Sequence, residues 1–129
     1  MRVTIASPAL RAGDRVVVSS STRVEWPAVW QGESGVDAGA SVDVEVEVPD
    51  PVVDWDVVEA GHAMAGISTV RGRVTVRGVV AATSDNGVVV LDLSPGVTMV
   101  ELADESRTPE VGAFIEFSPS AIALFPTGT

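Results

Sequence analysis

Four carboxylates lie close together in the middle of the chain, and carboxylate oxygens are ligands that Ca²⁺ and Mg²⁺ prefer. Asp54 and Asp56 are two residues apart, so they would share one face of a strand, and either Asp50 or Glu59 can join them. The spacing does not match that of a calcium-binding loop. Two interpretations stay open: a metal site at Asp54, Asp56 and Glu59, or a solvated strand edge whose charges discourage aggregation.

All eight basic residues of the chain are arginines, and three of them fall in one short run: Arg71, Arg73 and Arg77. In a strand, a period of two residues places their guanidinium groups on one face. Such a set can hold an oxyanion or phosphate, or it can pair with carboxylates. We expect pairing, because ten acidic residues and no basic residue lie between positions 24 and 70. The predicted partners across a strand pair are Asp43, Glu45 and Glu47.

The acidic residues at 43–47 have a second interpretation. Valine alternates with serine or a carboxylate throughout residues 41–48, which predicts a half-buried strand with its carboxylates facing outward. If the arginines do not cover this face, it is a solvated surface, a docking surface for a basic protein, or a mimic of the charge of a nucleic acid.

Trp26 and Trp30 lie on either side of Pro27 and precede a glycine-containing loop predicted at residues 31–40. One interpretation places both indoles in the core. The other exposes them beside the loop as a hot spot for a protein partner, because tryptophan is enriched at the centres of interfaces.

The usual catalytic motifs are missing from the sequence. There is no cysteine, His62 is the only histidine, and Ser19, Ser20 and Ser21 lack a G-x-S-x-G context. No glycine motif for phosphate or dinucleotide binding is present. We therefore expect neither enzymatic activity nor a cofactor.

Charge and hydropathy exclude further classes of function. The net charge of −10 disfavours nucleic acid as a partner, because phosphate binding depends on Lys and Arg. No apolar run approaches the roughly 18 residues of a membrane-spanning helix, and the first residues do not resemble a signal peptide. The expectation is a soluble, cytoplasmic protein that does not bind membranes.

The arginines belong to the segment that predicts the architecture most clearly, Val70 to Leu93. Two β-prone runs flank Ser84-Asp85-Asn86-Gly87, and Asn-Gly between apolar runs is a strong hairpin signal. We expect Val70 to Val80 to be one long strand, with valines inward, arginines outward, and bends at Gly72 and Gly78.

Other short runs of β-prone residues, separated by glycine, proline and serine, predict further strands. The strands predicted at 41–48 and 52–59 are connected through Pro49-Asp50-Pro51, which could fold them back as a hairpin. The predicted strands besides these two lie at residues 3–6, 15–20, 23–26, 96–102, 111–117 and 121–125.

The strands predict an all-β protein, a small antiparallel barrel or sandwich preceded by an N-terminal β-meander. Residues 1–129 would form one domain, with possible halves at 1–60 and 67–129. Residues 13–27 and 112–126 share Gly, branched aliphatic, Ser, aromatic and Pro positions, which either reflects a duplicated strand-turn-strand unit or convergent composition.

The order of elements from Val70 to Phe125 resembles an OB-type small barrel. The closing segment VGAFIEFSPSAIALFP, residues 111–126, is similar to the tail of the TOBE-type OB modules of transporter ATPases. This resemblance implies a regulatory or oxyanion-sensing accessory barrel, and it carries over no ligand residue.

Two functions follow from the sequence. The first is a non-catalytic protein-interaction or self-assembling module, which docks through strand edges or the aromatic loop. The second is a barrel that binds a small ligand, an oxyanion or a divalent cation.

Overall fold

The computed structural model describes residues 1–20, 23–59 and 64–127, and strands are the only regular secondary structure within them. The prediction of an all-β fold is therefore confirmed. The strands are β1 (Arg2–Ser7), β2 (Arg15–Ser19), β3 (Glu25–Trp30), β4 (Ser41–Glu47), β5 (Asp56–Val57), β6 (Gly66–Val70), β7 (Arg73–Thr83), β8 (Val88–Asp92), β9 (Val97–Glu101), β10 (Phe114–Phe117) and β11 (Ala123–Pro126).

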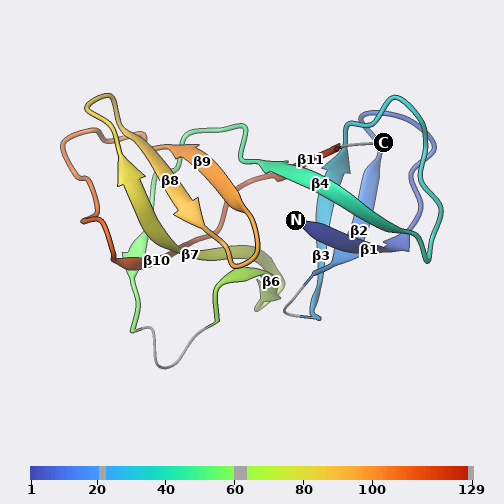
Figure 1. Ribbon diagram of the computed structural model, residues 1–129, viewed down its shortest axis with the longest axis horizontal. Coiled ribbons are helices and arrows are strands. Elements are labelled where there is room, and N and C mark those ends of the chain that lie inside the picture. Colours follow the sequence, from blue (N-terminus) through green and yellow to red (C-terminus); the bar gives the residue numbers. More distant parts are fainter. Residues whose placement is uncertain (21–22, 60–63, 128–129) are drawn as a thin grey trace.

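A closed barrel forms from β1, β2, β3, β11 and β4, in that order, and lies on the right of Figure 1. The C-terminal strand, β11, runs parallel to β3 and antiparallel to β4. The backbone N–H groups of Val29 and Gln31 donate to the carbonyls of Ile122 and Leu124. The C-terminal strand thus closes a barrel whose other four strands come from the first 47 residues.

The second sheet has the order β5-β10-β7-β8-β9 and lies on the left of Figure 1. The long strand β7 pairs with β10 along one edge, and with β6 and then β8 along the other. Val52 extends the sheet beyond β9, because its N–H donates to the Glu101 carbonyl and its carbonyl accepts from Ala103. The segment from Val52 to β5 therefore runs from the β9 edge of the sheet to the opposite edge, where β5 pairs with β10.

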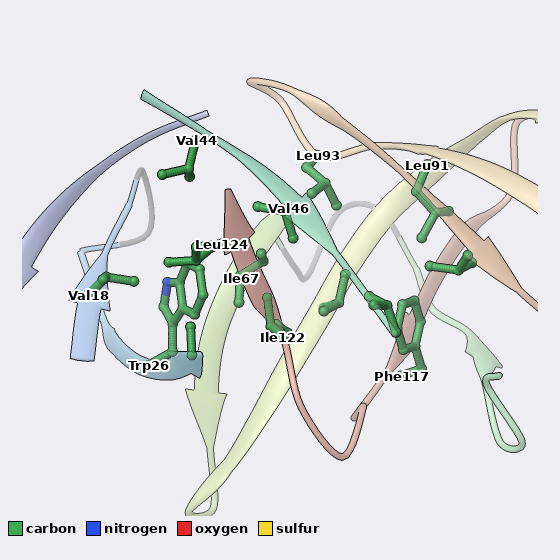
Figure 2. Packing of buried hydrophobic residues seen from close by; sticks show 14 of the residues in the cluster. Val18, Trp26, Val44, Val46, Ile67, Leu91, Leu93, Phe117, Ile122 and Leu124 are labelled. Carbon is green, nitrogen blue, oxygen red and sulfur yellow. The ribbon is translucent and has the colours of Figure 1, made fainter. Parts of the chain in front are cut away.

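The buried side chains of the two sheets form one hydrophobic cluster. Figure 2 shows side chains from both, among them Trp26 and Leu124 of the barrel and Ile67 of β6. Two side-chain hydrogen bonds also cross the junction: Thr98 Oγ1 donates to the Val46 carbonyl at 2.9 Å, and Thr69 Oγ1 donates to the Glu25 carbonyl at 2.6 Å.

The predicted hairpin between β7 and β8 is confirmed, but its turn differs from the expected one. Of Asn86 and Gly87, only Gly87 has a positive φ, and the Ser84 N–H donates to the Val88 carbonyl across the loop. A glycine in the left-handed conformation after a turn is typical of the longer hairpin loops.

The expectation of one continuous strand over Val70 to Val80 is wrong. Arg71 and Gly72, with φ values of 53° and 77°, form a two-residue turn that joins β6 to β7. Positive φ at both positions is what a type I′ hairpin turn requires, and glycine accepts it without steric cost. Gly78 does lie inside β7, where a Cβ would be 2.8 Å from the Asp92 carbonyl oxygen.

Pro27 does not end a strand as predicted, because β3 continues through it to Trp30. The N–H of Trp30 points toward the β2 side and those of Val29 and Gln31 point toward β11. By alternation, the Pro27 nitrogen faces the β11 side, where β11 pairs only with Val29 and Trp30. The missing donor therefore breaks no ladder hydrogen bond.

A hairpin through Pro49-Asp50-Pro51 does not form. Only Asp56–Val57 of the strand predicted at 52–59 is a strand, and β5 pairs with β10 instead of folding back on β4.

The two similar segments differ in structure. β10 and β11 lie in different sheets, whereas β2 and β3 pair with each other, so 13–27 and 112–126 do not form equivalent units. The possible halves at 1–60 and 67–129 stay a prediction, although β11 pairs with strands of the first 47 residues.

Replacing Thr98 by valine should destabilise the protein, because the Val46 carbonyl would lose its partner at a buried position. The expected loss in the free energy of unfolding is about 1–3 kcal/mol. Denaturant unfolding of Thr98→Val measures it, with exposed Thr4→Val in β1 as the matched control. A loss no larger than that of the control would contradict the role given to this hydrogen bond.

Candidate functional site

The acidic face of β4 is exposed, as predicted, but it does not meet the arginine run. Asp43, Glu45 and Glu47 point outward while Val44 and Val46 are buried. The neighbours of β4 are β1 and β11, so no strand pair brings it against β7, and the predicted ion pairs are wrong. Asp43 pairs instead with Arg2, at 3.1 Å.

The interpretation of Trp26 and Trp30 as an exposed hot spot is wrong. Both indoles are buried, because alternate residues of β3 face the barrel interior. The Trp30 Nε1–H donates to the Ser34 carbonyl at 2.8 Å, and Gly32 lies so close to the ring that a Cβ there would be 2.7 Å away. The glycine-containing loop therefore covers Trp30 instead of exposing it.

The three arginines do come together, in a cleft of about 640 Å³ that we call the arginine cleft. Its lining includes Arg71, Arg73 and Arg77, from the β6–β7 turn and β7. The lining also includes residues 50–54 and Asp56, from the segment that leads into β5, and residues 116–120. Asp56 lies on the same sheet face as Arg77, because both residues pair with Glu116 of β10.

Of the three arginines that line the cleft, Arg77 has a carboxylate partner. Its Nε–H donates to Glu116 of β10 at 2.8 Å, and the two residues are directly paired across the strands. In the described part of the chain, Arg71 and Arg73 make no ion pair and donate no side-chain hydrogen bond. Two exposed guanidinium groups are thus left without a partner in the cleft.

Arg71 occupies a backbone conformation that arginine rarely adopts. Its φ of 53° lies in the left-handed region, which costs an L-residue with a Cβ roughly 1–2 kcal/mol and which Asn and Gly tolerate better. Backbone geometry alone therefore does not account for an arginine at this position of the turn.

Packing around Trp55 holds the segment that carries Asp54 and Asp56 in place. Trp55 is buried, so its neighbours Asp54 and Asp56 point outward into the cleft. The Arg107 guanidinium stacks on the Trp55 ring, 3.9 Å from its centroid, and Nη2 donates to the Trp55 carbonyl at 3.2 Å.

The turn that carries Arg107 begins at Asp104. Ser106 donates to Asp104 Oδ1 through its hydroxyl and its backbone N–H, at 2.5 and 3.0 Å. These hydrogen bonds, with a smaller contribution from the Arg107 charge, lower the pKa of Asp104.

The metal site predicted at Asp54, Asp56 and Glu59 does not form. In residues 1–20, 23–59 and 64–127, no group of three or more His, Cys, Asp or Glu side chains is placed to hold a metal ion. Asp54 and Asp56 line the arginine cleft, and Glu59 is not among its lining residues. His62 lies outside the described residues.

A second hollow, which we call the β9 groove, runs between the barrel and the second sheet and has a volume of about 790 Å³. Its apolar lining includes Val97 and Met99 of β9, which are 63% and 66% exposed, and Phe125 of β11, which is 38% exposed. Glu45, Glu47 and Glu101 also line it, and no arginine does among the described residues.

Sequence reasoning missed the β9 groove, although one signal was present. A strand with one solvated face alternates apolar with polar residues. The run Val97-Thr98-Met99-Val100 instead has apolar residues on both faces, with Val97 and Met99 on one and Val100 on the other. Thr98 and Val100 face the core, so Val97 and Met99 must face outward. The placement of Phe125 beside them depends on β11 joining the barrel, which has no local signal.

The backbone of β9 is unpaired along the side that faces away from β8. The Leu102 N–H donates to the Gly87 carbonyl, so by alternation Thr98 and Val100 also bond to β8. The N–H and C=O groups of Val97 and Met99 then point away from β8. Among the described strands β9 pairs only with β8, and Val52 occupies its free edge only at Glu101.

Comparisons with protein families, curated proteins and solved structures find no match to this chain. The resemblance of the C-terminal half to an OB-type barrel therefore stays a prediction. Within the described residues, no helix is long and apolar enough to cross a membrane.

Two double-mutant cycles distinguish the observed charge pairing from the expected one. Arg77→Gln and Glu116→Gln should show a coupling of about 0.5–1 kcal/mol in the free energy of unfolding, because the pair is only partly exposed. Arg73→Gln and Glu45→Gln, on strands that do not pair, should be additive. Coupling in the second cycle and additivity in the first would show that the strand arrangement is wrong.

Proposed function

We propose that the protein is a non-catalytic interaction module that binds an extended segment of a protein partner at the free edge of β9. The observation that carries the proposal is the combination of unpaired backbone groups and exposed apolar side chains on one short strand. Sheet edges of this kind bind peptides by adding a strand, with main-chain hydrogen bonds supplying affinity and side-chain pockets supplying specificity.

Hydrophobic burial supports docking at this edge. A partner strand would cover Val97 and Met99 and extend toward Phe125 across the β9 groove. Fully burying a Val or Met side chain contributes roughly 1.5–3 kcal/mol, so these residues can supply a substantial part of a micromolar affinity.

Charge favours a basic partner over a second copy of the chain. The rim of the β9 groove carries Glu45, Glu47 and Glu101. Two copies meeting through β9 would bring these carboxylates together, and the chain as a whole carries a net charge of −10. A segment that carries Lys or Arg beside its apolar residues would instead place apolar side chains on Met99 and bring positive charge near the rim.

Peptides of alternating valine and arginine, with alternating valine and glutamate peptides and scrambled sequences as controls, test this function. The arginine peptide should shift the backbone amide NMR signals of Val97 and Met99, and the two controls should not. Binding should weaken as salt rises, because the rim charges are exposed.

Met99→Pro is the sharpest variant for this test. Proline removes the one N–H of Met99, which points away from β8, so the β8–β9 ladder should survive while peptide binding is lost. Unchanged binding by a folded Met99→Pro protein would overturn strand addition. A concentration-dependent dimer that Met99→Glu dissociates would favour self-association instead.

A further inference from the structure

We propose that the arginine cleft is a separate binding site for a small dipolar ligand, which carries a carboxylate at one end and an ammonium or guanidinium at the other. Amino acids and short peptides with free ends have this chemistry. The inference rests on the cleft alone and does not depend on the β9 groove. The volume of the arginine cleft, about 640 Å³, is in the range typical of small-ligand sites.

The carboxylate end is assigned to Arg71 and Arg73. Their guanidinium groups lack protein partners in the described part of the chain, whereas Arg77 is occupied by Glu116. The planar fork of arginine matches a carboxylate with two parallel hydrogen bonds.

The positive end is assigned to Asp54 and Asp56, which also line the cleft. These carboxylates likewise make no ion pair and accept no hydrogen bond among the described residues, whereas Asp50 accepts one from Ser120 at 2.9 Å. Besides the pair of Arg77 and Glu116, the cleft is therefore lined by two arginines and two aspartates that do not pair with each other. A simple anion would meet the aspartates and a simple cation the arginines, but a ligand with both charges can pair with both sets.

The conformation of Arg71 is an independent reason to assign it a role. Asparagine or glycine would suit its φ of 53° better, so the arginine is not there to stabilise the turn. Residues held in rarely occupied backbone conformations are concentrated at functional sites.

NMR titration with diglycine, triglycine and tetraglycine tests the proposal and scans the distance between the two charges. At least one of these peptides should shift the amide signals of Gly72 and Arg73. Its N-acetylated and C-amidated forms, which each lack one charge, should bind at least tenfold more weakly. Inorganic phosphate should also bind at least tenfold more weakly than the best peptide.

Arg71→Asn separates binding from folding. It should keep or raise the melting temperature, because asparagine suits the turn, and should weaken binding of the best peptide at least tenfold. Asp54→Asn should weaken it by a similar factor. Arg15→Gln and Asp85→Asn, at exposed positions that do not line the cleft, are the matched controls.

Three results would overturn the proposal. They are no binding by any of the three peptides, binding of phosphate or the N-acetylated peptide as tight as that of the free peptide, and unchanged binding by Arg71→Asn or Asp54→Asn. Loss of peptide binding at the β9 groove would leave the proposal for the arginine cleft unaffected.

Discussion

The insertion of β11 between β3 and β4 is the constraint on which the rest of the structure depends. Without this insertion, β3 and β4 would each expose an unpaired edge. The carbonyls of Ile122 and Leu124 would have no donors. Because β11 follows β10 after a short crossing at residues 118–122, the same insertion ties the barrel to the second sheet. The common hydrophobic cluster and the hydrogen bond from Thr98 to Val46 then reinforce the junction.

Both candidate binding surfaces follow from this crossing. Residues 117–120 line the arginine cleft, and Phe125 of β11 contributes to the β9 groove. The two hollows nevertheless differ in chemistry. The arginine cleft is lined by both arginines and aspartates, whereas the β9 groove combines an apolar strand edge with a rim of glutamates. We therefore expect different ligands at the two sites.

Features set by local alternation could be predicted from the sequence, and features set by distant strands could not. The run at 41–48 predicted an exposed acidic face and a buried valine face, and both are present. One of the two interpretations of Trp26 and Trp30 placed both indoles in the core, and their spacing could have selected it, had Pro27 not been taken as the end of the strand. By contrast, the partners of Asp43 and Arg77, which are Arg2 and Glu116, depend on which strands are neighbours. The arginines at 71–77 were correctly grouped, although Arg71 reaches the cleft from a turn and not from a strand.

The proposed function requires a free edge on β9, which amide hydrogen exchange in the isolated protein can detect. The Thr98 and Val100 amides, which bond to β8, should exchange slowly. The Val97 and Met99 amides, which point away from β8, should exchange much faster. Equal protection of all four amides would show that the edge is already covered, and would contradict the account.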